Sequence, residues 1–457
     1  MLKSIKLSNF KSFGEEQEIK LAPITLLYGP NSSGKSSIIQ SLLLIKQSIE
    51  NRSQHAAPTF SGRLIDLGSY NTIVHKHDSD KDIKISVEYN SSISVQEHIY
   101  RTSNNPIFGN HDIRGLELTY SNYQVGPENV SYLNNINFSC RQNKSDNEII
   151  EFNIVNLKGK RFGIDRESTF KIDEAGQNKL RKFVYARVSK TNTSISENQI
   201  INSLNDKLNL SVDMNLPIHS MFPDGGEHIN FIFNQIFSEL KCNFEDLKYL
   251  GPLRSAPKRF YSSLNDGNNN IAIRLCEDRK ELTKDINLWF ERFEIPYELS
   301  VEDIGNLVTG KILSIQLRDT RSDTVVTPAD VGFGIGQVLP IIIESLVSRN
   351  TTICVEQPEI HLHPRLQAHL ADLFIASIKN NNQWIIETHS EALLLRLQRR
   401  IRNKSSDILH EQIRISYIDC SDYGAQVTEL PIDNDGDFLV HWPDGFFEER
   451  LTEQYGD

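Results

Sequence analysis

The sequence has no long apolar segment, few cysteines and no excess of basic charge. None of its runs approaches the ~18 apolar residues of a membrane span, and its first residues resemble a lysine-containing strand more than a signal peptide. Five cysteines, an odd number with no C-x-x-C pair, indicate neither disulfides nor a zinc site. We therefore expect a soluble, cytoplasmic protein without a membrane partner.

The charge balance excludes a protein that coats DNA through bulk charge. The chain has 49 basic and 60 acidic residues, which give a formal charge of −11. Local basic patches remain open as nucleic-acid contacts, although most such runs are solvated helix faces. One candidate patch comprises Arg396, Arg399, Arg400, Arg402 and Lys404.

The length of 457 residues favours more than one lobe. Both ends of the chain alternate strand and helix patterns, whereas the segment between them is rich in short β-type runs and has no nucleotide motif or sustained heptads. We predict an α/β lobe split by an insertion. The expected parts are 1–75 (first half of the lobe), 76–245 (insertion), 246–437 (second half of the lobe) and 438–457 (tail).

A glycine-rich loop joins a predicted buried strand, 24–28, to a predicted helix over 38–49. The loop at 29–36 reads GPNSSGKS and matches G-x-x-x-x-G-K-[ST] in full. In such loops backbone N–H groups surround phosphates at a helix N-terminus, the lysine reaches the β- and γ-phosphates and the serine ligates Mg²⁺. We predict ATP and Mg²⁺ as cofactors. The expected nucleotide contacts are Asn31, Ser32, Ser33, Gly34, Lys35, Ser36 and Ser37, with Ser36 also a metal ligand.

Two further predicted strands end in polar side chains. Glu356 and Gln357 follow the strand 351–355, and His389 follows the strand 384–387. Ligands bind at the carboxyl ends of strands in open α/β sheets, so we expect Glu356 to face the metal and His389 to sense the γ-phosphate. A purely structural role for His389 remains the alternative.

Several motifs together resemble the SMC/RecF/OLD-like branch of ABC-type P-loop ATPases. They are NFKSF at 9–13, the loop at 29–36, EQPEIHLHP at 356–364 and ETHS at 387–390. The blocks at 249–254, 332–337 and 442–447 are similar to those of PtuA-like ATPase subunits of bacterial Septu anti-phage defence. The resemblance implies an α/β ABC-type lobe with a mixed sheet, a long β-rich and helical insertion and no long coiled coil.

The resemblance also implies that ATP is bound between two copies of the chain. The family's signature L-S-x-G-x-x-Q is replaced by VGFGIGQ at 331–337, so Gly332, Gly334 and Gln337 are the expected contacts to the partner's nucleotide. An unrelated glycine turn before a helix is the alternative. The resemblance implies that the histidines of 361–364 belong to the D-loop at the dimer interface. Their i,i+2 spacing, with no third ligand nearby, does not suit a metal site.

The catalytic base of the family is missing. In the family the Walker B strand, here 351–355, is followed by two acidic residues. The second of them is replaced by Gln357, whose amide orients a water but accepts no proton. Loss of a general base typically costs ~10²–10⁴ in rate. Slow or absent hydrolysis is therefore expected, with Glu356, Gln357 and His389 as the catalytic candidates and Glu359 or His389 as substitute bases.

Three functional hypotheses follow. The leading one is a regulatory ATPase subunit of an anti-phage complex, dimeric or larger, which controls a separate nuclease, for example of the HNH type, and meets DNA through the complex. No segment suits the Toprim nuclease of OLD-type relatives, so cleavage is expected from the partner. A RecF-like DNA clamp would need salt-sensitive, ATP-dependent DNA affinity. A transporter subunit is disfavoured by the insertion and the altered signature.

Overall fold

The computed structural model describes residues 1–50, 58–90, 113–125, 128–141, 148–156, 169–188, 208–209, 236, 238–254, 258–262, 281–308, 310, 312–403 and 408–443. Contacts within the chain divide it into two units. Unit 1 comprises Met1–Leu21, Gly29–Leu247 and Ser416–Thr428, and unit 2 comprises Ala22–Tyr28, Lys248–Ile415 and Glu429–Asp457.

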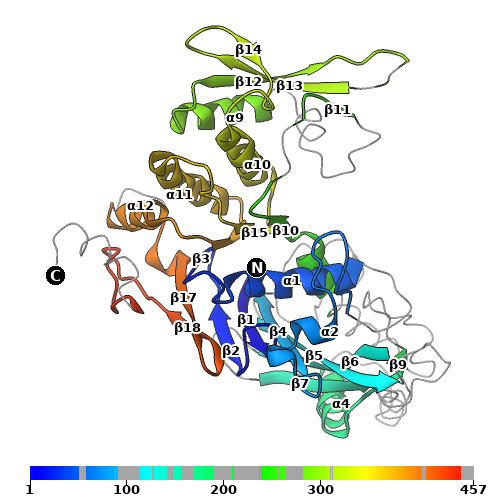
Figure 1. Cartoon of the computed structure of the whole chain (residues 1–457). Helices are drawn as coiled ribbons and strands as arrows, with labels where there is room; N and C mark the ends of the chain where they lie inside the picture. The colour runs from blue at the N-terminus through cyan, green and yellow to red at the C-terminus, as the bar shows by residue number, and fades with distance from the viewer. Residues whose placement is uncertain are drawn as a thin grey trace. The chain divides into compact units, whose positions relative to one another are not determined.

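Unit 1 is built on an antiparallel sheet (Figure 1). In order across the sheet its strands are β2 (Gln17–Lys20), β1 (Leu2–Ser8), β4 (Ile83–Asn90), β5 (Ile113–Val125), β6 (Glu128–Arg141), β7 (Glu148–Asn156), β8 (Thr169–Ile172) and β9 (Leu208–Asn209). β4 shows the alternation of a sheet with one covered face, because its Ile and Val side chains are buried and the residues between them are not. The helices of this unit are α1 (Lys35–Glu50), α2 (Tyr70–Ile73), the 3₁₀ helix η1 (His75–His77) and α4 (Glu174–Val188).

A buried ion pair lies in unit 1. Arg114 on β5 and Glu239 in the helical segment 238–245 are both fully buried, with 3.1 Å between Nε and Oε2. Arg114 Nη1 also donates to Cys140 Sγ on β6 at 3.0 Å. A buried charge is tolerated when it is paired and hydrogen-bonded, so these contacts fix the helical segment to the sheet.

Unit 2 contains a sheet with parallel strand pairs. Its strands are β10 (Lys248–Leu250), β15 (Thr352–Glu356), β16 (Gln383–Glu387) and β3 (Ile24–Tyr28), in that order, and the pairs β10–β15, β15–β16 and β16–β3 are parallel. β17 (Ile413–Ser421), which begins in this unit, and β18 (Gly424–Glu429) continue the order. β15, β16 and β3 are buried at every position, as is typical of parallel strands covered on both faces.

Helices of unit 2 follow its strands. They are α9 (Glu281–Arg292), α10 (Phe333–Val347), α11 (Pro364–Ile378), α12 (Glu391–Arg402) and the 3₁₀ helix η3 (His410–Gln412). α11 packs against both α10 and α12. Among the described helices, none has the length and hydropathy needed to cross a membrane.

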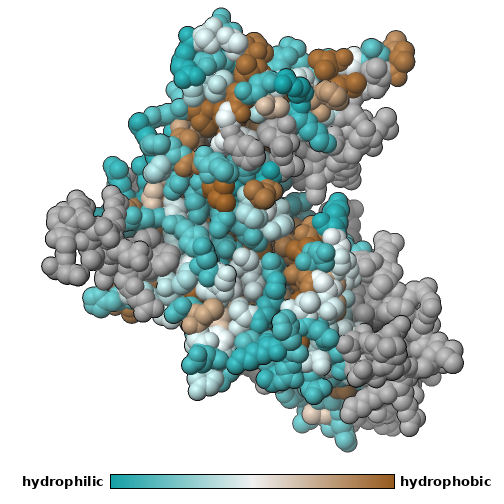
Figure 2. All heavy atoms as spheres, viewed as in Figure 1, coloured by the Kyte–Doolittle hydropathy of each residue, from teal (hydrophilic) through white to brown (hydrophobic). Residues whose placement is uncertain are grey.

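A small antiparallel sheet with α9 packed on it forms a separate lobe of unit 2 (Figure 1). Its strands are β11 (Tyr261–Ser262), β12 (Tyr297–Asp303), β13 (Ile312–Asp319) and β14 (Val325–Val326). The β12–β13 connection exposes Leu307 and Val308 almost completely, and Ile304 by 55%. Figure 2 shows hydrophobic surface on this lobe, which is a feature of binding surfaces.

Candidate nucleotide site

The glycine-rich loop connects β3 to α1 in a conformation that requires its glycines. Gly29 and Gly34 have φ of 143° and 109°, a region that disfavours side chains. A Cβ at Gly29 would clash with the carbonyl oxygen of Ile418, and one at Gly34 with the hydroxyl of Ser12. Ser32 also has a positive φ, 64°. The loop is therefore held in one tight turn at the start of a 16-residue helix, as a phosphate-binding loop requires.

Lys35 is folded back over this loop. Its side chain is buried, and Nζ donates to the carbonyl oxygens of Gly29 at 2.9 Å and Pro30 at 2.6 Å. The ammonium is thus directed into the turn at the N-terminus of α1, where the helix dipole and free N–H groups favour an anion.

The serines of the loop supply hydroxyl groups at the same turn. Ser33 is buried, and its hydroxyl has no hydrogen-bond partner among the residues that the structure describes. Ser36, in the first turn of α1, is partly exposed, whereas Asn31 and Ser32 are exposed. An unpaired buried hydroxyl beside an ammonium and a helix N-terminus fits a bound phosphate with its cation, so the donor set suits the predicted Mg·ATP.

The metal-side candidate, Glu356, is the last residue of β15 and is 7% exposed. Its carboxylate accepts a hydrogen bond from the Tyr249 hydroxyl at 3.1 Å, and its carbonyl accepts one from Arg254 Nη2 at 2.9 Å. Burial, followed by the charge of Glu356, raises the pKa of Tyr249, so the phenol stays protonated and continues to donate. Burial lowers the pKa of Arg254 to about 10, against the opposing effect of Glu359 and Glu356.

Gln357 occupies the position of the missing base in an uncommon conformation. Its φ is 43°, and its backbone N–H donates to the carbonyl of Glu387 on β16 at 2.7 Å. Left-handed backbone at a residue other than glycine stores strain and is enriched at functional sites. The geometry therefore makes this residue a candidate for function although its side chain cannot act as a base.

Glu359 connects the loop after β15 to the loop after β16. Its carboxylate accepts hydrogen bonds from Thr388 Oγ1 at 2.8 Å and from the backbone N–H of His389 at 2.7 Å. Burial raises the pKa of Glu359 in spite of these bonds. Glu359 consequently positions the backbone of His389, and its raised pKa brings it closer to the range of a general base.

The signature-like segment forms the N-terminus of α10, as the sequence predicts. Gly332 caps the helix, is exposed and has open space where a Cβ would stand. A Cβ at Gly334 would approach the His361 carbonyl oxygen to 3.0 Å. Packing therefore restricts position 334 but leaves room for a serine at position 332.

A shallow, mainly apolar pocket of about 510 Å³ adjoins this segment. Its walls include Gly332 and Ile335 from the start of α10, Leu362 from the loop after β15, and Tyr297 at the start of β12. The pocket therefore joins the signature-like segment to the small lobe within unit 2.

The histidines of the loop after β15 have local structural contacts. His363 caps α11, and its Nδ1 accepts a hydrogen bond from the backbone N–H of Arg365 at 3.3 Å. His361 has a φ of 62°. Within the described part of the chain, no group of three or more His, Cys, Asp or Glu residues is placed to hold a metal ion.

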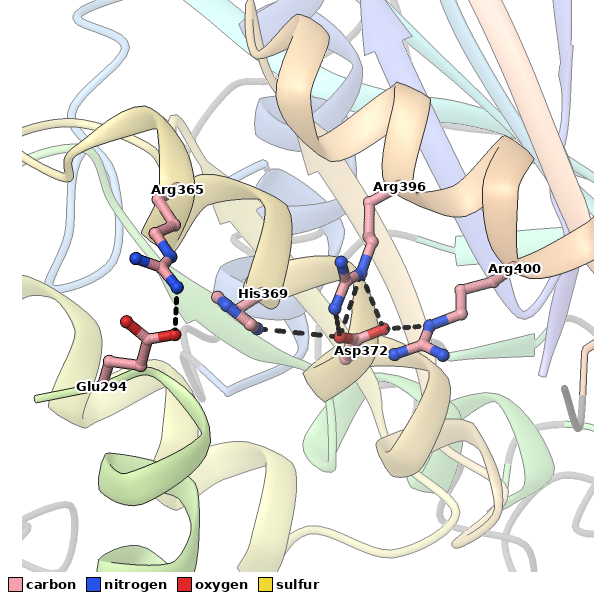
Figure 3. Close-up of polar contacts among 6 residues, drawn as sticks. All are labelled: Glu294, Arg365, His369, Asp372, Arg396 and Arg400. Atoms are coloured by element: carbon pink, nitrogen blue, oxygen red, sulfur yellow. Dashed lines mark hydrogen bonds and ion pairs between the residues drawn. The ribbon is translucent and has the colours of Figure 1, made fainter. Parts of the chain in front are cut away.

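The basic patch on α12 is engaged with carboxylates (Figure 3). Arg396 and Arg400 both bind Asp372 on α11, at 2.7 Å and 2.6 Å, and Arg402 binds Asp437 at 2.6 Å. Lys404 lies outside the described residues. These arginines mainly link elements of unit 2, which favours the structural interpretation of the patch.

Within unit 2 the structure brings together residues that are far apart in the sequence. Gln337 and Glu356 are both hydrogen-bonded to Arg254, and Glu359 holds the backbone of His389. Tyr249 and Arg254 were noticed in the sequence only as parts of a shared block. Their polar side chains, at the end of a short strand, were the signal that could have identified them. The catalytic and binding roles of the predicted site residues remain predictions.

Residues 1–394 match the family AAA_15, "AAA ATPase domain", and residues 408–453 match DUF3696, a "protein of unknown function" family. The search of curated proteins found no match.

Several solved structures are similar over 94% of this chain. An SMC head bound to the C-winged helix domain of ScpA has a TM-score of 0.46, with 13% identity and 98% of that chain covered. The SMC head domain from Thermotoga maritima has a TM-score of 0.38, with 11% identity and 99% covered. An SMC head with an extended coiled coil, bound to the C-terminal domain of ScpA from Pyrococcus furiosus, has a TM-score of 0.42, with 13% identity and 96% covered.

The expected fold class is confirmed. The chain has an α/β fold with a P-loop and matches a family of ATPase domains over residues 1–394, and β-rich and helical structure lies between the two sequence halves. Among the described helices the longest, α1, has 16 residues, so these residues contain no long coiled coil. The family model covers most of the chain, and the complete phosphate-binding loop lies within it. The chain belongs to the AAA_15 family of AAA ATPase domains.

Proposed function

We propose that this chain is the ATP-binding regulatory subunit of a bacterial anti-phage defence complex, in which two copies bind Mg·ATP between them and control a separate nuclease. The observation that carries the nucleotide part is the turn at residues 29–36. Its glycines admit no side chain, and the Lys35 ammonium and the Ser33 hydroxyl are buried in it. On this proposal the protein acts in the cytoplasm.

In the proposed mechanism Lys35 and the backbone N–H groups at the start of α1 bind the phosphates. Ser36 and Glu356 are assigned to Mg²⁺ because of their places in the Walker A and Walker B motifs, and the metal neutralises charge on the phosphates. Tyr249 orients the Glu356 carboxylate through its hydrogen bond. Glu359 orients the backbone of His389, the assigned γ-phosphate sensor.

Slow hydrolysis follows from Gln357. Its amide orients a water without accepting the proton, and the substitute bases are Glu359, with its raised pKa, and His389. ATP then acts chiefly as a ligand that stabilises one state of the protein, and turnover resets that state only occasionally.

The dimer is proposed from the signature-like segment. In it the N-terminus of α10, with Gly332 and Gly334, faces the phosphates bound by the other copy, and Gln337 supports this turn. Helix N-terminal N–H groups bind anions without a serine, which makes Gly332 compatible with this role. The absence of the family's serine hydroxyl at Gly332 would weaken the contact to the partner's phosphates. Dimer formation is therefore expected to depend strongly on ATP concentration.

The defence role and the nuclease partner are proposed from the resemblance to PtuA-like subunits. The apolar β12–β13 connection, with Leu307 and Val308 exposed, offers a surface for the effector. A RecF-like clamp is less favoured because Arg396 and Arg400 already bind Asp372.

The first test is the mass of the purified protein in solution with and without Mg·ATP, measured by light scattering. Wild-type protein should shift from monomer to dimer with ATP, Lys35→Ala should not shift, and Gly332→Ser should dimerise at lower ATP because the open space accepts the hydroxyl. If the mass of the wild-type protein is the same with and without Mg·ATP, the proposed ATP-sandwiched dimer is refuted.

The second test is co-purification of the tagged protein from its native locus, with assay of any companion on plasmid DNA. A stoichiometric nuclease whose activity changes with ATP supports the regulatory subunit. A dimer without a companion protein that binds DNA only in the presence of ATP would favour the RecF-like DNA clamp over the regulatory subunit.

A further inference from the structure

Two buried side chains with unused donors lie between α10 and the carboxyl end of β15. Arg254 is 8% exposed and Gln337 is fully buried. Within the described part of the chain, Arg254 Nε and Gln337 Nε2 have no hydrogen-bond partner. An unpaired buried donor costs roughly 1–3 kcal/mol, so each such group in a native structure calls for an explanation.

The guanidinium of Arg254 makes a bridge between these elements. Nη2 donates to the carbonyl oxygen of Glu356 at 2.9 Å, and Nη1 donates to Gln337 Oε1 at 3.4 Å. The backbone N–H of Arg254 approaches the same Gln337 oxygen at 3.5 Å. The contact to α10 is long and the contact to β15 is short, so the bridge is firm at one end and loose at the other.

The carboxylates of Glu359 and Glu356 act on the charge of Arg254 without forming an ion pair with it. Among the described residues, Arg254 has no carboxylate within ion-pair distance. The acceptors that hold it are the neutral carbonyl and amide oxygens named above. A buried guanidinium held by neutral acceptors exchanges one acceptor for another at lower cost than one locked in an ion pair.

We propose that Arg254 is a positioning residue that couples the signature-like end of α10 to Glu356. The proposal rests on the proposed function, in which the start of α10 meets the partner's nucleotide and Glu356 serves the metal. Occupancy of the signature-like segment moves Gln337, and the guanidinium passes this movement to the main chain of Glu356. Each copy thereby registers its partner's nucleotide at its own metal-side carboxylate.

Hydrogen exchange followed by mass spectrometry tests this coupling, on the full-length protein with and without Mg·ATP. The variants are Arg254→Met, Gln337→Met and the double variant, because methionine keeps the volume and removes the polar bridge. Arg318→Met is the matched control, since Arg318 on β13 is an exposed arginine with ion pairs to Glu298 and Asp323. Two segments are compared, the first turns of α10 and residues 356–359, with β16 as an internal reference.

Without nucleotide, Arg254→Met should raise exchange in both segments by about tenfold while β16 and the control stay unchanged, an effect expected from losing a buried charged hydrogen bond. Exchange in the two segments should be no faster in the double variant than in the single variants, because the two side chains act as one unit. With Mg·ATP, wild-type protein should gain protection in both segments, whereas Arg254→Met should retain ATP binding and lose the joint response.

Exchange within twofold of wild type in both apo segments would overturn the coupling. An equal rise in exchange throughout the protein would show that Arg254→Met destabilises the whole fold. Gln337→Met then tests the coupling, because it removes the same bridge from the α10 side: a rise in the two segments alone supports it, and no rise there overturns it. Wild-type protein that binds no ATP would overturn the regulatory role through failure of the proposed function, while the apo exchange data would still show whether the bridge exists.

Discussion

Replacing Lys35 with methionine separates the nucleotide role of this residue from its role in folding, because α1 contains a second lysine in a similar setting. Lys35 and Lys46 are 3% and 7% exposed, and each donates to two backbone carbonyl oxygens. The partners of Lys46 are the carbonyls of Phe244 and Glu245, at 3.0 Å and 2.7 Å, and the Glu50 carboxylate at 2.8 Å. Lys46→Met is therefore a matched control for Lys35→Met.

Both variants should lose similar stability. A hydrogen bond from a charged donor contributes about 1.5–3 kcal/mol, and removing the buried ammonium returns part of its desolvation cost. We expect a net loss of about 2 kcal/mol for each variant, or about 2–4 °C in Tm. In contrast, ATP affinity should fall about 100-fold for Lys35→Met alone, because about 3 kcal/mol of phosphate contact is lost.

The assays are thermal unfolding and titration with a fluorescent ATP analogue. Mg·ATP should raise the Tm of wild-type protein and of Lys46→Met, and should leave that of Lys35→Met unchanged. Equal loss of affinity in both variants would show that the effect is one of folding. Unchanged affinity in both would refute the assignment of residues 29–36 as the phosphate site.

Three further outcomes are expected. Gln357→Glu should raise the steady-state ATPase rate about 10–100-fold, part of the ~10²–10⁴ that a general base supplies, as measured by phosphate release. Glu239→Gln should destabilise the protein in urea by about 3–5 kcal/mol because it leaves the Arg114 charge buried and unpaired, whereas Arg114→Met with Glu239→Leu should be nearly neutral. Burial, followed by the charge of Arg396, lowers the pKa of His369. As the pH drops below about 6.5 the unfolded state therefore binds the proton before the folded state does, and the free energy of unfolding falls. His369→Gln should make this fall less steep, as measured by urea unfolding at several pH values.

Different results would contradict each of these. An unchanged ATPase rate in Gln357→Glu would show that Glu359, His389 or another group already acts as base. A cost below about 1 kcal/mol for Glu239→Gln would mean that the ion pair is hydrated or absent. If the stability of His369→Gln fell with pH as steeply as that of wild-type protein, groups other than His369 would be responsible. The neighbouring Asp372 carboxyl is not such a group near neutral pH. Burial raises its pKa, but hydrogen bonds from Arg400 and Arg396 lower it below its ordinary value.

The local elements of the candidate site were predictable because their sequence signals are short-range. The phosphate-binding loop needs glycine at positive φ and a following helix, and the pattern at 29–36 specifies both. The mainly apolar runs at 351–355 and 384–387 predicted buried strands ending just before Glu356 and shortly before His389, and β15 and β16 lie there. A helix after the glycines of the signature-like segment was predictable for the same reason, although α10 already begins at Phe333.

The basic patch shows where local reasoning stops. A run of arginines at helical spacing gives the same signal for a nucleic-acid surface and for an internal ion-pair cluster. The carboxylate that distinguishes them, Asp372, lies on a different helix from Arg396 and Arg400 (Figure 3). Its position depends on how α11 packs against α12, which no sequence window contains.

The sequence by itself determined the P-loop, the order of the strands along the chain, and the replacement of the family's base by Gln357, because each of these is written in contiguous residues. Only the tertiary structure decided that Arg254 bridges Gln337 and Glu356, and that Glu359 holds the backbone of His389. These contacts join residues up to 102 positions apart. They exist because parallel strands bring distant segments to one edge of a sheet, where burial makes polar groups find partners in each other.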